Sequence, residues 1–335
     1  EELERDENEE KKKLGIVARH ITRVFYKRDG VGFFPKERQH LWTIDVKNGK
    51  ATQLTDSEVH DEREPRWSPD GKTLLFLSNR TEDPDLDPEV IDLFVIPAEG
   101  GVCRKIETPL GEKFGASFSP DGTWIAYFGR EGRGQWWKQG RVWAVATDGR
   151  KSVKNLTEKY DANVAGWTIN DLNHIPATPA TWSLDGRLIY FQIARHGNTL
   201  LQAVSLDGKE PTVVDIVDDD GVVGEYTFDR SQESLAFFHA DLKSFGQIWV
   251  KNMKTDSLRK VTHFNETWLR NVDLGTVEEV WFNGASGNDL QGWILKPPMF
   301  DEKRSYPSIL EIHGGPITQY GNFFMHEFYY LAAQG

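Results

Sequence analysis

An internal repeat restricts the fold of this chain more than any other feature of its sequence. A phrase of the form aromatic-Ser-Pro-Asp-Gly, strict in its first two copies and degenerate in its last two, begins at Trp67, Phe118, Trp182 and Phe228. A second, apolar phrase contains Trp42, Phe94, Trp143, Leu201 and Trp249. Both phrases return about every fifty residues, which is a period typical of propeller blades. The chain is therefore expected to fold as consecutive blades.

Each repeat predicts a four-stranded antiparallel sheet. In Ser-Pro-Asp-Gly, the proline presets φ, the aspartate bonds nearby backbone and the glycine accepts a positive φ, so the phrase closes a tight turn. The segments that follow, such as TLLFLS at 73–78, have apolar residues on both faces. Such strands must be covered on both sides, as happens when blades stack around an axis. We expect the four aromatic residues that open the turns at equivalent buried positions.

About five units fit between residues 16 and 265, and the first of them lacks its opening turn. This indicates that earlier blades are absent from the chain, although a propeller of five blades is the alternative. The tight turns fall at one end of the strands. Long insertions fall at the opposite end, at residues 27–40, 79–92, 129–140 and 158–180. In repeat folds, the face with insertions is often the binding face.

The pattern changes after residue 265. Residues 279–282 and 290–295 flank an Ala-Ser-Gly-Asn-Asp sequence that predicts a hairpin. Residues 306–313 then form a short apolar run typical of a buried central strand, and Gly314-Gly315-Pro316 follows directly. Residues 323–333 have the length and apolar density of a helix, with Gly335 at the C-cap position. Residues 266–335 therefore predict the beginning of an α/β domain.

Charge and hydropathy exclude several classes of protein. Lys and Arg total 40 against 52 for Asp and Glu, giving a formal net charge of −12. General binding to nucleic acid or to an anionic membrane requires a basic surface, so neither is expected. No apolar run approaches the roughly 20 residues that cross a bilayer, and the sequence is typical of a soluble protein.

The number of cysteines and the first fifteen residues give information about the cellular compartment of the protein. Cys103 is the single cysteine, which excludes an internal disulfide framework and a cysteine-based zinc site and fits a reducing compartment. Residues 1–15 form a charged segment that is most simply a solvated loop or frayed helix, and it does not resemble a signal peptide. A mature, already cleaved form would look the same, so the cytoplasm is only favoured.

The blade phrases and the C-terminal His-Gly-Gly-Pro together resemble the prolyl oligopeptidase family of serine peptidases, most closely the acylaminoacyl peptidase branch. The resemblance extends from His40-Leu-Trp-Thr-Ile-Asp to Pro316. It implies a β-propeller that caps an α/β-hydrolase domain carrying a Ser-Asp-His triad. It also implies hydrolysis of short peptides without a cofactor, with the propeller limiting access by large folded proteins, and exposed strand edges that often pair between subunits.

The resemblance assigns roles to the glycine loop. In the family, this loop contributes a backbone N–H to the oxyanion hole, and the matching positions are Gly314 and Gly315, with Gly315 the first choice. Only a small residue lets the backbone approach a developing oxyanion to about 3 Å. His313 and Pro316 would shape the loop. Some relatives carry a tyrosine at the His313 position, and the histidine here argues against a tyrosine-assisted oxyanion hole.

The sequence departs from the family in one respect. A hydrolase of this fold needs a Gly-x-Ser-x-Gly elbow, followed by Asp and then His. The 335 residues contain no such elbow, and residues 284–288 are the nearest look-alike. By family order, the whole triad would lie beyond Gly335. The chain is therefore expected to be the propeller blades plus the start of the catalytic domain, truncated before the nucleophile and inactive by itself.

Other residues admit more than one interpretation. The insertion from Arg130 to Arg141 gathers cations and indoles: Arg130, Arg133, Trp136, Trp137 and Arg141. It could contact an acidic group or peptide terminus, pack on the hydrolase domain, or join two blades. The histidines have no metal-ligand spacing, and no metal is expected. His313 as a general base is disfavoured because the family's catalytic histidine comes last in the chain.

A non-catalytic propeller of the TolB kind, acting as a binding scaffold, is the competing hypothesis. It explains residues 16–265 equally well, but it does not explain why a hydrophobic run, His-Gly-Gly-Pro and a helix should follow. A Gly-x-Ser-x-Gly sequence within roughly a hundred residues beyond Gly335 would decide for the enzyme. The sequence does not decide between exopeptidase and endopeptidase modes.

Overall fold

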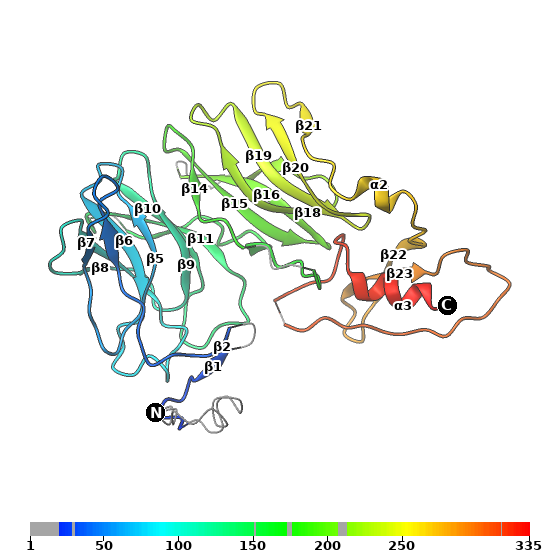
Figure 1. Cartoon of the computed structure of the whole chain (residues 1–335), viewed down its shortest axis with the longest axis horizontal. Helices are drawn as coiled ribbons and strands as arrows, with labels where there is room; N and C mark the ends of the chain where they lie inside the picture. Colours follow the sequence, from blue (N-terminus) through cyan, green and yellow to red (C-terminus); the bar gives the residue numbers. More distant parts are fainter. Residues whose placement is uncertain (1–19, 29–30, 151, 173–175, 207–212, 316) are drawn as a thin grey trace.

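The computed structural model describes residues 20–335 except 29–30, 151, 173–175, 207–212 and 316 (Figure 1). The charged segment at 1–15 lies outside the described residues. The described part is nearly all β-structure with few helices. Its strands form four consecutive antiparallel blades, preceded by a two-stranded half-blade of β3 (Trp42–Ile44) and β4 (Ala51–Gln53). A short pair, β1 (Lys27–Arg28) and β2 (Gly32–Phe33), comes first.

The first two blades are separate four-stranded sheets. Blade I contains β5 (Glu62–Trp67), β6 (Thr73–Ser78), β7 (Asp92–Pro97) and β8 (Arg104–Ile106). Blade II contains β9 (Lys113–Phe118), β10 (Trp124–Gly129), β11 (Arg141–Ala146) and β12 (Lys154–Asn155). In each blade, successive strands along the chain pair as neighbours, as the tight turns of the repeat predict.

The last two blades are linked through one parallel bridge between Thr199 and Val222. Blade III contains β13 (Asn163–Val164), β14 (Thr181–Trp182), β15 (Leu188–Arg195), β16 (Asn198–Ser205) and β17 (Val213–Val217). Blade IV contains β18 (Val222–Phe228), β19 (Ser234–Asp241), β20 (Ser244–Asn252) and β21 (Leu258–Lys260). Both β13 and β14 pair with β15, so they are two parts of one edge strand, and the insertion between them leaves the blade at residue 165.

The hydrophobic cores lie between neighbouring blades. Leu75 of blade I packs with Ile125 and Tyr127 of blade II, and equivalent clusters join blade II to blade III and blade III to blade IV. Each fully buried side chain of this size contributes about 1.5–3 kcal/mol to stability. Packing on both faces explains why the central strands are apolar throughout, as the sequence predicted.

The tight turns form as expected. In the first, the Ser68 hydroxyl donates to Asp70 Oδ1 at 2.7 Å, and the N–H of Gly71, at φ +70°, donates to the Ser68 carbonyl. The hydrogen bonds that Asp70 accepts from the Ser68 hydroxyl and from Lys72 N–H lower the pKa of its carboxyl, because they favour its charged form. The later turns at Asp121 and Asp185 repeat the same bonds.

The expectation that the four repeat aromatics are equally buried is wrong for Trp67. All four end the first strand of their blade, but Trp182 alone is buried: Phe118 and Phe228 are half-buried, and Trp67 is 55 % exposed. Phe118, Trp182 and Phe228 each pack in the hydrophobic cluster between their own blade and the preceding one. In the described part of the chain, the two-stranded half-blade is the only sheet of the blade pattern ahead of blade I, so Trp67 lacks the four-stranded neighbour that the other three aromatics have.

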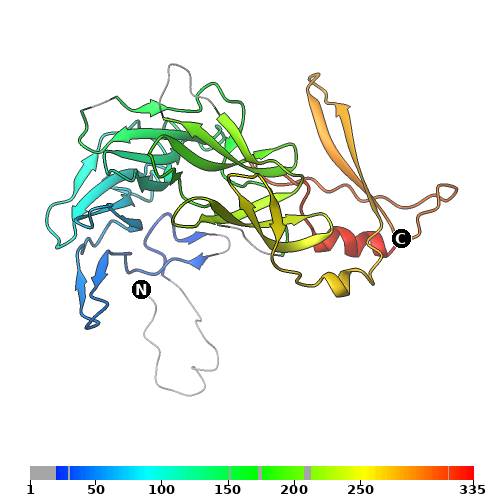
Figure 2. The same ribbon diagram turned by 90° about the horizontal axis from the view of Figure 1, so that it is seen from above.

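The chain beyond blade IV departs from the blade pattern. A short helix α2 (Glu266–Leu269) leads to the expected hairpin of β22 (Thr276–Asn283) and β23 (Asp289–Lys296), whose tip stands clear of the blades in Figure 2. The helix α3 (His326–Ala333) forms within the expected range. It begins three residues later than expected, because Phe323, Phe324 and Met325 are buried ahead of it and Met325, the N-cap residue, has extended backbone.

The strand expected at residues 306–313 is not present. This run has no regular structure, and Ile309, Leu310 and Ile312 are exposed. A strand requires a hydrogen-bonded neighbour, and no described segment pairs with this run. Residues 266–335 therefore contain the hairpin, the glycine loop and α3, without the expected central strand.

Candidate functional site

The glycine loop has a backbone that requires glycine at one position. Gly315 has φ +139°, and a Cβ there would lie 2.9 Å from Ile317 N and 3.0 Å from Thr318 Oγ1. Gly314 has open space around its Cβ position. Pro316 lies outside the described residues. A side chain at Gly315 would therefore be both strained and crowded.

Two side chains hold the carbonyl between the glycines. Thr318 Oγ1 donates to the Gly314 carbonyl at 2.5 Å, and His313 Nδ1 lies 2.7 Å from the same oxygen, so Nδ1 carries the proton. The Gly314–Gly315 peptide is trans, so its N–H points away from its carbonyl. Fixing the carbonyl thus fixes the direction of the Gly315 N–H, from which none of the described residues accepts a hydrogen bond.

A row of edge-on aromatic contacts lies beside the glycine loop. The His313 ring packs edge-on against Tyr320 at 5.7 Å, and Tyr320 packs edge-on against Phe328 of α3 at 5.1 Å. Burial and the nearby carboxylates of Glu311 and Glu327 raise the pKa of Tyr320. Tyr320 is therefore a neutral packing group beside the loop, and it does not supply a charge.

The cationic insertion divides into a buried part and an exposed part. The Arg130 side chain is only 3 % exposed: it is paired with Glu112, donates to Lys138 O at 2.6 Å and lies over the Trp167 ring at 5.7 Å. Arg141 donates to the Thr157 carbonyl, and burial lowers its pKa. These two arginines tie the insertion to its own blade and to the next one.

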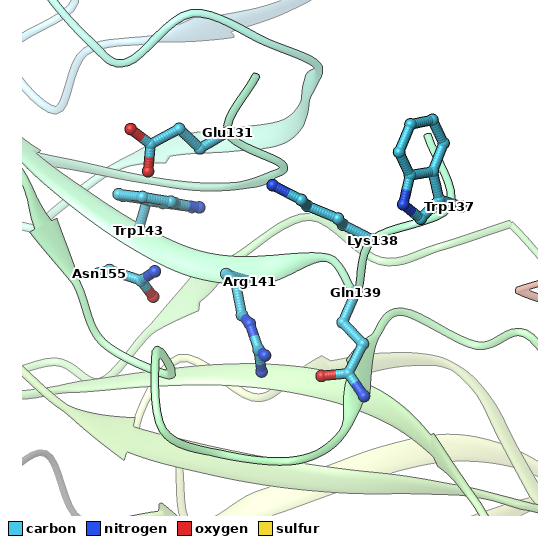
Figure 3. Close-up of a pocket in the computed structure, with 7 residues that line it drawn as sticks. All are labelled: Glu131, Trp137, Lys138, Gln139, Arg141, Trp143 and Asn155. Atoms are coloured by element: carbon cyan, nitrogen blue, oxygen red, sulfur yellow. The ribbon is translucent and has the colours of Figure 1, made fainter. Parts of the chain in front are cut away.

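The exposed part consists of Arg133, Trp136 and Trp137. Arg133 pairs with Asp87 at 3.1 Å, and the two indoles are 47 % and 53 % exposed and pack edge-on at 6.3 Å. Beside them lies an open hollow of about 430 Å³, lined from the insertion and from β11 and β12 (Figure 3). Its lining residues are Glu131, Trp137, Lys138, Gln139, Arg141, Trp143 and Asn155.

One side chain connects the insertion to the glycine loop. Asn163 accepts a hydrogen bond from Gly140 N at 2.7 Å and donates to Ile317 O at 3.4 Å. The structure thus brings the end of the 129–140 insertion and the residues just after Gly315 to the same end of blades II and III. Sequence reasoning missed Asn163, because nothing in the local pattern marks an asparagine whose partner is 154 residues away.

Among the described residues, no group of three or more His, Cys, Asp or Glu side chains could hold a metal ion. Cys103 is a free, half-buried thiol, and burial raises its pKa. In the described part of the chain, no helix is long and apolar enough to span a membrane.

The described part of the chain consists of blades followed by a hairpin, a glycine loop and a helix, and the known proteins that it is similar to include peptidases. No protein-family model matches the chain. The uncharacterized peptidase YuxL of Bacillus subtilis is 28% identical over 336 residues, covering 98% of this chain and 49% of that protein. Dipeptidyl-peptidase 5 of Trichophyton tonsurans is 28% identical over 268 residues, covering 76% of this chain and 35% of that protein.

Solved structures share the fold. An acylaminoacyl peptidase bound to a peptide chloromethyl ketone superposes with a TM-score of 0.72 at 19% identity, covering 94% of this chain and 45% of that one. A puromycin hydrolase gives a TM-score of 0.58 at 14% identity, covering 92% of this chain and 56% of that one. The homologues and structural neighbours are serine peptidases of the prolyl oligopeptidase family, the family that the sequence resembles. The chain spans about half or less of the curated relatives it matches.

Proposed function

We propose that residues 16–265 are the propeller blades, and residues 266–335 the first part of the catalytic domain, of a serine peptidase that hydrolyses short peptides. The peptidase relatives, one of which aligns over 98% of the chain, support this function. The observation that carries it is the glycine loop: its Gly314 carbonyl is held by two side chains, which fixes the direction of the Gly315 N–H, and no described residue accepts a hydrogen bond from that N–H.

In this proposal, the Gly315 N–H donates a hydrogen bond to the oxyanion of the tetrahedral intermediate. The fixed donor needs no reorientation as charge develops, and one such donor is worth about 10²–10³ in kcat. The nucleophile, the base and its aspartate follow Gly335 in the order Ser, Asp, His. His313 orients the loop, since its Nδ1 proton is engaged by the Gly314 carbonyl.

The blade insertions form the propeller side of the substrate chamber in this proposal. Arg133, Trp136 and Trp137 are exposed near the end of the blades that faces the glycine loop, where they would contact a peptide or the rest of the catalytic domain. The propeller would thereby exclude large folded proteins. We place the enzyme in the cytoplasm, a proposal that the lone, free Cys103 supports.

The test compares the complete gene product with the isolated 335-residue chain. An acyl-amino-acid anilide and a nitrophenyl ester serve as substrates, and a serine-directed inhibitor serves as the control. We expect inhibitor-sensitive hydrolysis by the complete protein and none by the isolated chain, because an oxyanion donor alone supplies neither nucleophile nor base. Hydrolysis by the isolated chain would mean that the nucleophile has been misplaced. An inactive complete protein would favour the binding scaffold instead.

A further inference from the structure

Gln319 lies four residues beyond Gly315, and the propeller binds every polar atom of its amide. Its Nε2 donates to Thr168 Oγ1 at 2.8 Å and to Asn198 O at 3.0 Å. Its Oε1 accepts from Gly197 N at 3.2 Å. Its backbone N–H donates to Trp167 O, and its carbonyl accepts from Ile169 N. Five hydrogen bonds from blade III therefore hold this one residue. It belongs to residues 313–335, which we call the catalytic segment because the proposed function places them in the catalytic domain.

These contacts belong to a larger junction, which we call the clamp and define as residues 163–171 of the blade III insertion. The clamp contacts the catalytic segment at three places. Asn163 contacts Ile317, residues 167–169 contact Gln319, and Asp171 accepts hydrogen bonds from His326 N and Glu327 N at 2.8 and 2.7 Å. A continuous run of nine residues thus holds the chain from two residues after Gly315 to the first turn of α3.

The β15–β16 turn completes the junction. Gly197 in this turn is so close to the catalytic segment that a Cβ built at Gly321 would overlap its carbonyl oxygen. Asn322 N donates to that same oxygen at 2.8 Å. Two glycines in backbone contact leave no room for sliding, so the register of the catalytic segment on blade III is fixed.

The direction of the oxyanion donor depends on this junction. Within the described residues, the run that precedes the loop is exposed and irregular, so the loop is anchored from its C-terminal side. Thr318, which holds the Gly314 carbonyl, is the direct neighbour of Gln319. Any displacement of Gln319 would therefore reach the Gly314–Gly315 peptide through a single residue.

We propose that Gln319 is a positioning residue for the oxyanion loop, and that the propeller, through the clamp, sets the direction of the Gly315 N–H. This inference rests on the proposed function, and it adds a second task for the propeller besides limiting access. Gln319 does not touch substrate. It acts by fixing the backbone that carries the donor, and misplacement of a catalytic group by about 1 Å can cost up to about 10²-fold in rate.

The experiment uses the complete gene product with Gln319→Met, which keeps the side-chain length and removes every amide hydrogen bond. We expect kcat to fall about tenfold with KM unchanged, because the lost interaction acts only in the transition state. A peptide boronate, which forms a tetrahedral adduct, should bind more weakly by the same factor. A non-hydrolysable peptide that binds as a ground state should bind as before.

Gln247→Met is the matched control. Gln247 is a buried glutamine of blade IV whose amide donates to Phe264 O and accepts from Phe264 N and Thr262 Oγ1, all far along the chain from the glycine loop. The Gln247→Met variant loses about as many side-chain hydrogen bonds as Gln319→Met. It should therefore lower thermal stability and leave kcat unchanged. Thr168→Val, which removes one acceptor of Gln319, is the milder second variant and should lower kcat in the same direction.

Hydrogen exchange provides a readout that does not depend on activity. The amides of Ile169, Gln319 and Asn322 donate hydrogen bonds across the junction. They should exchange faster in Gln319→Met than in the wild type, whereas in Gln247→Met they should not. Unchanged exchange of these three amides would overturn the inference, as would equal losses of boronate and ground-state binding. A wild-type protein without inhibitor-sensitive hydrolysis would instead overturn the proposed function, while exchange would still report on the clamp.

Discussion

At the scale of single residues, Gly315 shows how backbone geometry limits the sequence of the glycine loop. Its positive φ and the close approach of Ile317 and Thr318 exclude a side chain for steric reasons alone. The same peptide unit carries the candidate oxyanion donor. At Gly315, the steric exclusion of a side chain and the proposed role of the N–H as a donor therefore coincide. To separate them, a substitution at Gly315 has to be compared with one at a glycine that has a positive φ but no proposed catalytic role.

Gly315→Val in the complete protein should lower kcat by on the order of a hundredfold, as loss of one oxyanion donor does elsewhere. Gly101→Val is the matched control, because Gly101 also has a positive φ, of +125°, but nothing lies near its Cβ position. Steady-state kinetics and circular dichroism of both variants check the prediction. Near-normal turnover in Gly315→Val would show that the Gly315 N–H is not an oxyanion donor.

His239 in β19 gives a prediction for the pH dependence of stability. Burial lowers its pKa, and the nearby carboxylates of Asp241 and Asp219 only partly oppose this. The unfolded chain then binds a proton more readily than the folded one below pH about 6.5, so the folded state loses stability as the pH falls. The urea midpoint of the wild type, relative to His239→Gln, should decrease between about pH 8 and about pH 5. A constant difference would contradict this account.

At the scale of elements, α3 depends on an acceptor from another part of the chain. Its own N-cap residue, Met325, has no capping side chain. Asp171 of the clamp instead accepts hydrogen bonds from the N–H groups of His326 and Glu327. A carboxylate at this position satisfies two free donors and also interacts favourably with the helix dipole.

Asp171→Ala should therefore destabilise α3 by about 1 kcal/mol, the usual cost of losing a cap. Hydrogen exchange at residues 327–333 should become faster, while Asp171→Asn, which retains one acceptor, should give a smaller change. Asp148→Ala is the control, because Asp148 caps only a local turn at Arg150 in blade II. Equal exchange of α3 in Asp171→Ala and Asp148→Ala would show that the clamp does not stabilise this helix.

At the scale of the whole molecule, the predictable features are those whose causes are local. The blades follow from turn chemistry within a few residues, as the bonds around Asp70 show. The exposure of Trp67 and the missing strand at 306–313 were predicted wrongly, because both depend on a neighbouring sheet. Asn163 and Gln319 carry no local signal at all, since their partners lie 154 and 151 residues away.

The separation of these partners also sets an order of assembly. Blade III ends at Val217, roughly a hundred residues before the glycine loop, and domains generally fold as they emerge. The catalytic segment therefore meets a surface that is already formed, and only the shorter, later segment has to be ordered when the clamp closes. The propeller would thus serve as a template on which the oxyanion loop acquires its shape during synthesis.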